Sequence, residues 1–222
     1  MDDPNAAQSI WDIENLWYQE APPSRLTKAL AQYEVARSAV GVPGDFAEFG
    51  VFKATSFIRL ATYRDVLDPG GARTLYGFDA FGAYPEPARA DDAEYITEFE
   101  AWAGLGLSEA ETRRLLDRKG FRNVELIAGD VRRTLPAFLA EHPDVRFALV
   151  HVDVNAEDAT REILERCLDR ISPGGAFMLD DYGKVDGATN AIDEFAAVQR
   201  GLTLEEPRAE NGPWALRVPS EG

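Results

Sequence analysis

The sequence predicts an α/β protein with a mostly parallel, doubly wound sheet. The clearest indication is a pair of short apolar runs that end on acid, residues 147–153 and 176–182. Between them lie a polar helical pattern and a Ser-Pro-Gly-Gly breaker at residues 172–175. This arrangement is typical of a β-α-β unit, whose crossover is nearly always right-handed and whose strands are parallel. A similar alternation of strand and helix patterns runs through most of the chain, which favours helices on both faces of the sheet.

Composition limits the kinds of partner. With 222 residues and 45% apolar content, the chain can bury one sizeable core, so we expect a single main domain with additions. A net charge of −16 argues against nucleic acid and against an anionic membrane surface, which leaves a small-molecule ligand. The single cysteine, Cys167, lies in a helical pattern and has no partner for an internal disulfide. Together with the lack of a signal-like N-terminus or an 18-residue apolar run, this predicts a cytoplasmic protein.

Residues 1–41 are predicted to form a helical extension. Apolar and aromatic residues at helical spacing indicate a short amphipathic helix over residues 9–19, which we expect to pack on the main body or on a partner subunit. A second helix is predicted from Ser24, as N-cap, to about Val40. The main domain then covers residues 42–222.

Within the main domain, strand and helix patterns follow one another in regular order. The expected strands cover residues 44–50, 74–79, 123–128, 147–153 and 176–182. The expected helices cover residues 55–66, 133–139, 158–171 and 188–200. Residues 202–206 and 214–218 are predicted to close one edge of the sheet as an antiparallel pair.

One connection is longer than the sheet needs. The chain leaves the second strand at residue 80 and reaches the next helix only after residue 106, where Ser108 and Glu111 form a predicted capping box. Strand-to-helix loops usually need about 2–6 residues, so an excursion of this size at the ligand edge suggests a lid or a substrate wall. A purely structural insertion is the alternative.

Acids at the ends of two neighbouring strands suggest a metal site. Asp153 ends the fourth predicted strand, and Asp180 and Asp181 end the fifth. Parallel neighbours lie about 4.8 Å apart, so these carboxylates should meet at one edge of the sheet. Clustered carboxylates repel one another unless a cation joins them, and oxygen ligands suit Mg²⁺, Mn²⁺ or Ca²⁺. Three separate, solvated strand-end acids would give the same spacing.

The first three strand ends have the residues of a nucleoside site. Glu48 and Gly50 close the first strand, Asp79 closes the second, and Asp130 follows the third. A glycine there lets a ligand approach the backbone, and an acid after the second strand accepts hydrogen bonds from ribose hydroxyls. The phosphate-binding G-x-G-x-x-G pattern is absent, which argues against NAD. S-adenosylmethionine, which has a ribose, an amine and a positive charge but no phosphate, fits better. Acids that merely cap turns are the alternative.

Seven segments together resemble one known family. They cover residues 42–51, 52–56, 77–82, 128–136, 151–155, 172–183 and 191–195. In this combination they resemble the macrocin O-methyltransferase-like enzymes of the TylF and MycF type, which use a metal and S-adenosylmethionine to methylate sugar hydroxyls of natural products. The resemblance implies a Rossmann-like class I methyltransferase fold for the main domain. It also implies a homo-oligomer and a small-molecule hydroxyl acceptor, with a glycoside among the candidates.

The resemblance assigns roles to individual positions. It implies that Asp153, Asp180 and Asp181 are the metal ligands and that Asp153, or else His151, is the general base. The implied cofactor contacts are Glu48, Gly50, Ser56, Asp79, Gly129, Asp130 and Val131. Several positions depart from the family pattern. Ala54 replaces a usual glycine, and Asn155 replaces the second acid of the D-x-D segment. The family also commonly has aromatic residues where Asp130 and Arg132 stand, and a Tyr-x-Ser/Thr in place of residues 157–159.

The expected reaction is therefore methyl transfer from S-adenosylmethionine to a hydroxyl, assisted by Mg²⁺ or another divalent cation. Two alternatives remain open at this stage. One is a metal-dependent oxygenase or hydrolase that uses the same acids. The other is a binding protein that keeps the fold and has lost the chemistry, for which the substitutions at Ala54 and Asn155 are the main argument.

Overall fold

The computed structural model describes residues 9–220 and contains a seven-stranded sheet with the order β3-β2-β1-β4-β5-β7-β6. The strands are β1 (Asp45–Phe49), β2 (Leu75–Asp79), β3 (Val124–Ala128), β4 (Phe147–Val152), β5 (Ile171–Leu179), β6 (Thr203–Glu205) and β7 (Trp214–Arg217). Strands β1 to β5 are parallel, and β7 is antiparallel to both β5 and β6. The predicted mostly parallel sheet with an antiparallel edge is confirmed. The order reverses between β1 and β4, where open α/β sheets bind ligands.

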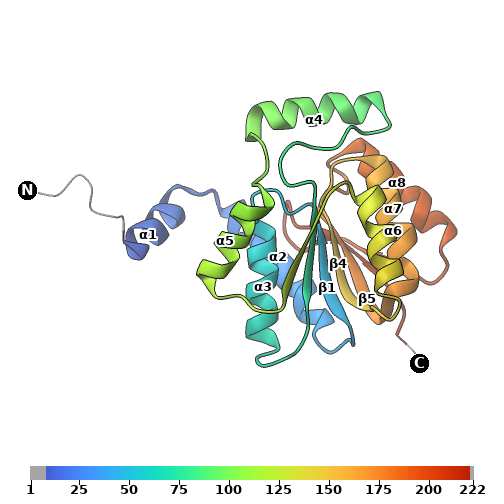
Figure 1. Cartoon of the computed structure of the whole chain (residues 1–222), viewed down its shortest axis with the longest axis horizontal. Helices are drawn as coiled ribbons and strands as arrows, with labels where there is room; N and C mark the ends of the chain where they lie inside the picture. Colours follow the sequence, from blue (N-terminus) through green and yellow to red (C-terminus); the bar gives the residue numbers. More distant parts are fainter. Residues whose placement is uncertain (1–8, 221–222) are drawn as a thin grey trace, which may run out of the picture.

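Helices cover both faces of the sheet (Figure 1). One layer contains α2 (Pro23–Ala39), α3 (Thr55–Leu67) and α5 (Glu109–Lys119), and the other contains α6 (Val131–Glu141), α7 (Glu157–Cys167) and α8 (Asp186–Val198). Because successive side chains of a strand point to opposite faces, Phe46 of β1 packs in the core under the first layer and Phe49 in the core under the second. Among residues 9–220, no helix combines the length and apolar character needed to cross a bilayer.

The N-terminal segment differs in two ways from expectation. The predicted first helix is present as α1 (Ile10–Glu20), capped by Ser9, but it has no buried residue and stands away from the body (Figure 1). The helix was expected to pack either on the main body or on a partner subunit, and the structure does not show it packed on the main body. The second helix begins at Pro23 with Pro22 as N-cap, so the prediction of Ser24 as N-cap is wrong. Proline fits the first helical position because it lacks an N–H and its φ is already helical.

Strand β5 begins earlier than predicted. Phe147 of β4 pairs with Ile171, and Leu149 pairs with Ala176, so residues 172–175 stand opposite the single residue Ala148. The Ser-Pro-Gly-Gly run therefore forms a bulge inside β5, where the sequence had suggested a breaker before the strand. A bulge tolerates both a proline and a glycine at positive φ, here Gly174 at 84°. The preceding helix, α7, ends at Cys167, short of the predicted residue 171, and is followed by a 3-10 turn over Leu168–Arg170.

The long excursion after β2 contains one helix of its own, α4 (Ala90–Ala103). This helix lies across one end of the molecule (Figure 1). Residues of α4 and of the segment before it line two hollows together with residues at the carboxyl ends of the strands. The predicted capping box at Ser108 and Glu111 is confirmed at the start of α5. The excursion thus contributes side chains to both hollows.

Candidate active site

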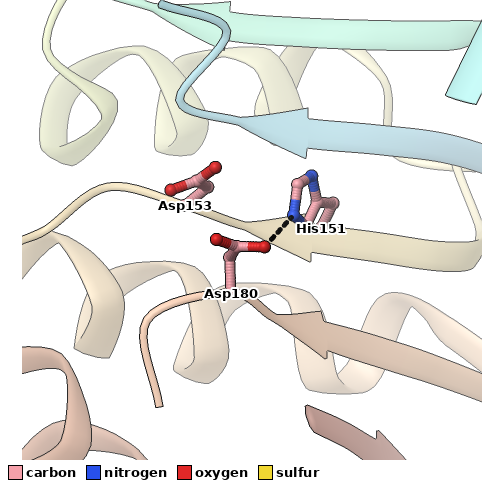
Figure 2. Close-up of side chains that lie close together, drawn as sticks. All are labelled: His151, Asp153 and Asp180. Carbon is pink, nitrogen blue, oxygen red and sulfur yellow. Dashed lines mark ion pairs between the residues drawn. The ribbon is translucent and has the colours of Figure 1, made fainter. Parts of the chain in front are cut away.

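Asp153 and Asp180 lie side by side at the carboxyl ends of β4 and β5. The last paired residues of these strands are Val152 and Leu179, so the next residue of each chain segment is the acid. One ligand atom from each of His151, Asp153 and Asp180 lies within 4.8 Å of the others. Figure 2 shows the three side chains close together at the ends of their strands. The third predicted ligand, Asp181, is held differently, because its Oδ2 accepts a hydrogen bond from the Asn155 backbone N–H at 3.0 Å.

The acid group, which consists of Asp153, Asp180 and Asp181, carries negative charge that its surroundings compensate only in part. Burial raises the pKa of Asp153 well above its usual range, and the charges of Asp180 and Asp181 raise it further. Burial and the charge of Asp180 likewise raise the pKa of Asp181 to about 6. The pKa of Asp180 is lowered despite burial, since His151 and two lysines stabilise its charge. Carboxylates that resist ionisation together gain from a further cation.

His151 lies between two carboxylates and is completely buried. Its Nδ1 is 3.1 Å from Glu48 Oε2, and its Nε2 is 3.8 Å from Asp180 Oδ1. Burial by itself lowers the pKa of His151, but Glu48 and Asp180 outweigh it and raise the pKa to about 10. Both ring nitrogens therefore face a carboxylate within ion-pair distance.

A first hollow of about 630 Å³, open to solvent, lies beyond the ends of β1, β2 and β3. Five predicted cofactor residues line it, namely Gly50, Asp79, Gly129, Asp130 and Val131. The Asp79 carboxylate accepts hydrogen bonds from the backbone N–H groups of Phe52, at 2.8 Å, and Phe81, at 2.6 Å. Both phenylalanines have positive φ, so Asp79 fixes two strained loops around the hollow.

The other two predicted cofactor residues lie elsewhere. Glu48 is completely buried and does not line the first hollow. The Ser56 hydroxyl donates to Glu48 Oε1 at 2.8 Å, and Ser56 lines a second cleft. Glu48 therefore joins Ser56 to His151 beneath the site.

The second cleft, with a volume of about 1500 Å³, opens directly above the acids. Asp153, Asp180 and Asp181 form part of its floor, and Tyr95, Phe99 and Trp102 of α4 line it as well. The two hollows share residues, Gly50 among them, so a ligand in one can meet a ligand in the other at the end of β1.

Three side chains near these hollows carry no assigned role in the sequence interpretation. Arg132 bridges Asp130 and Asp158, each at 2.5 Å, and also donates to the Glu86 carbonyl at 2.9 Å. Tyr84 accepts a hydrogen bond from Asn155 Nδ2 at 2.7 Å. Lys28 of α2 lies 2.6 Å from Asp180. Of these three contacts, only the pairing of Arg132 with Asp130 could have been suspected from the sequence, because the two residues are only two positions apart at the end of a strand.

The sheet order and the helices on both faces are those of the class I methyltransferase fold. Residues 24–207 match the family model for macrocin-O-methyltransferase (TylF), and the chain belongs to that family. Among solved structures, the calicheamicin methyltransferase CalS11 is similar in fold, with a TM-score of 0.74 and 23% identity over 96% of this chain and 87% of that one.

Two relatives are similar in sequence. The 8-demethyl-8-(2,3-dimethoxy-alpha-L-rhamnosyl)-tetracenomycin-C 4'-O-methyltransferase of Streptomyces olivaceus is 31% identical over 164 residues, which cover 71% of this chain and 59% of that protein. The mycinamicin III 3''-O-methyltransferase of Micromonospora griseorubida is 33% identical over 165 residues, which cover 70% of this chain and 61% of that protein. The match spans about three fifths of the length of these relatives.

Proposed function

We propose that this protein transfers a methyl group from S-adenosylmethionine to a hydroxyl of a small molecule, a sugar or another natural-product intermediate, with the help of a divalent cation such as Mg²⁺. The observation that carries the proposal is the meeting of two hollows at Gly50, one at the ends of β1 to β3 and one above the acids of β4 and β5. Two relatives, named as O-methyltransferases of a rhamnosyl-tetracenomycin C and of mycinamicin III, support the acceptor class.

The first hollow fits S-adenosylmethionine. A Cβ at Gly50 would lie 1.8 Å from the Asp153 carbonyl oxygen, and one at Gly129 would lie 2.8 Å from Thr134 Cγ2, so both of these positions at the hollow need glycine. Asp79 is the proposed ribose acceptor, and Asp130 and Val131 lie where the base would rest. When bound, this cofactor supplies an electrophilic methyl group on a sulfonium.

The acid group fits a divalent cation. Asp180 Oδ1 is buried without a hydrogen-bond partner among the described residues, and burial together with neighbouring carboxylates raises the pKa values of Asp153 and Asp181. We assign the cation to Asp153, Asp180 and Asp181, whose oxygens suit Mg²⁺. A cation bound there would lower the pKa of a nearby acceptor hydroxyl.

The remaining chemistry falls to side chains of the cleft. We assign the removal of the hydroxyl proton to Asp153, which lines the cleft, and not to His151, which is buried between Glu48 and Asp180. The aromatic side chains of α4 would cover the acceptor and exclude water, and the Asn155–Tyr84 hydrogen bond ties the excursion of residues 80–106 to the end of β4.

Calorimetry provides the direct test of the proposal. S-adenosylmethionine and Mg²⁺ should each bind the protein, and S-adenosylhomocysteine should form when glycosylated acceptors are added to the mixture. A protein that binds Mg²⁺ but not S-adenosylmethionine would favour the oxygenase or hydrolase alternative. Binding of the cofactor without turnover of any glycosylated acceptor would favour the binding-protein alternative.

Replacing Asp79 by Ala should weaken S-adenosylmethionine binding by about 5- to 150-fold, since a buried hydrogen-bonded acceptor is worth about 1–3 kcal/mol. The substitution removes the proposed ribose contact and releases the loops at Phe52 and Phe81. Calorimetric titration measures the change. Asp79→Asn keeps one carbonyl acceptor and should lose less. An unchanged affinity in Asp79→Ala would show that the ribose assignment is wrong.

We also propose that α1 packs on a second copy of the chain. Six of its large apolar or aromatic side chains are exposed, Ile10 by 73% and Trp11 by 70%, and helices with such a surface need a partner to bury it. Leu26 and Leu30 of α2 are also exposed and offer an apolar surface that could receive it.

Deleting residues 1–20 should convert the oligomer to a monomer or a smaller assembly and reduce acceptor turnover, while S-adenosylmethionine affinity stays within about 2-fold, because the proposed cofactor hollow contains no residue of α1. Light scattering after size-exclusion chromatography measures the mass, and calorimetry measures the affinity. Equal loss of assembly and of cofactor binding would indicate simple destabilisation. A full-length protein that is already monomeric would contradict the proposal.

A further inference from the structure

Lys28 is an internal cation of the acid group. Its Nζ donates to Asp180 Oδ2 at 2.6 Å, and its charge also stabilises Asp153. The Lys28 side chain is 19% exposed and that of Asp180 is 6% exposed, so water screens this ion pair only weakly. Lys184, the other lysine of the group, lies 4.0 Å from the same oxygen and donates instead to the Asp180 backbone carbonyl at 2.7 Å.

The position of Lys28 is set by helix α2 and not by the acids alone. Tyr63 of α3 donates its hydroxyl to the Ala29 carbonyl at 2.8 Å, and Val35, Ala36 and Ala39 at the other end of α2 are buried in the core. These contacts fix helix α2 on the core, so the backbone of Lys28 is held in place at the edge of the cleft. The four-carbon stem of a lysine is flexible, so the ammonium group can leave Asp180 while the helix stays in place.

We propose that Lys28 competes with the divalent cation for Asp180, so that the cation binds only when the lysine ammonium leaves this carboxylate. This inference rests on the proposed function, because it assumes the cation site. A cation bound by Asp180 Oδ1, the oxygen without a hydrogen-bond partner among the described residues, would lie beside an ammonium that already holds Oδ2 of the same carboxylate at 2.6 Å. Two positive charges on one buried carboxylate repel each other, so the cation binds Asp180 fully only once the ammonium has left it.

A purely structural lysine would behave differently from a competing one. If Lys28 only balanced the charge of Asp180, its loss would destabilise the protein and leave metal affinity unchanged or weaker. If Lys28 competes with the metal, a variant without this lysine lacks the Asp180 ion pair only in the metal-free protein, because the bound metal then compensates the carboxylate. The competing role thus predicts lower thermal stability in EDTA, restoration by metal, and tighter metal binding.

The experiment compares Mn²⁺ and Mg²⁺ binding to the full-length wild type, Lys28→Met and Lys53→Met at one pH, by calorimetry and by the electron paramagnetic resonance signal of free Mn²⁺. Lys53 is the matched control, because it lines the same cleft but its Nζ donates to the Ala103 carbonyl and contacts no acid of the group. Lys28→Met should bind Mn²⁺ about 10-fold or more tightly than the wild type, and Lys53→Met within about 3-fold.

Lys28→Arg keeps the charge and should not show the gain, and Lys28→Gln replaces Lys28→Met if that variant does not fold. If the wild type binds the metal and neither Lys28→Met nor Lys28→Gln binds it more tightly, the inference is overturned, but metal use in the proposed function still stands. Binding by the uncharged variant alone would support the inference and contradict metal use by the wild type. No binding by any of the proteins would contradict both.

Discussion

Replacing Asp153 by Asn should reduce methyl transfer by about 10³-fold or more, because the side chain is proposed both to hold the cation and to take the hydroxyl proton. Affinity for Mg²⁺ should fall as well, while S-adenosylmethionine should bind as in the wild type, since Asp153 lines the second cleft and not the first hollow. Steady-state assays with a confirmed acceptor measure the rate, and calorimetry measures both affinities. The size of the side chain is unchanged, so the fold should persist.

Glu165→Gln is the matched control, since it removes one negative charge from an exposed site on α7. Its rate and affinities should equal those of the wild type. A rate for Asp153→Asn within about 10-fold of the wild type would show that another group removes the proton. Full wild-type activity in excess EDTA, with the same acceptor, would show that the reaction needs no divalent cation.

Replacing Gly50 by Ala should abolish cofactor binding and destabilise the fold by roughly 2–5 kcal/mol, the sum of left-handed backbone strain and overpacking. Gly50 has a φ of 94°, and a Cβ built on it would lie 1.8 Å from the Asp153 carbonyl oxygen. The end of β1 would therefore have to move away from the end of β4, where the two hollows meet. Chemical denaturation measures the stability, and calorimetry measures binding.

Gly70→Ala separates the two causes. Gly70 has a similar φ of 85°, but a Cβ there would meet nothing within 4 Å. The substitution Gly70→Ala should lower the free energy of unfolding only by the backbone strain, about 1–2 kcal/mol, and leave cofactor binding intact. If Gly50→Ala behaved like Gly70→Ala, the close approach of β1 and β4 would have no part in forming the cofactor site.

The fold class and the acids at the strand ends could be predicted because their signals are local. Apolar runs with strand spacing, helical patterns and Gly or Pro punctuation specify each element within its own residues. Because parallel neighbouring strands bring their carboxyl ends to one edge, two such runs ending in Asp153 and Asp180 were enough to place these acids together. The start of β5 could not be read in this way, since Ile171 joins the strand only through its pairing with Phe147 across the Ser-Pro-Gly-Gly bulge.

The partners of the site side chains depend on contacts between distant segments. Lys28 meets Asp180 across 152 residues of sequence, and no periodicity in either segment indicates the contact. Glu48 lies one residue before the end of β1, and its partner on the neighbouring strand β4 is His151, so its carboxylate faces His151 and does not line the cofactor hollow. The sequence by itself determined which strand ends carry acid, because side-chain spacing within an element is local. Only the tertiary structure decided which charges those acids face, because electrostatic and packing contacts depend on distance in space and not along the chain.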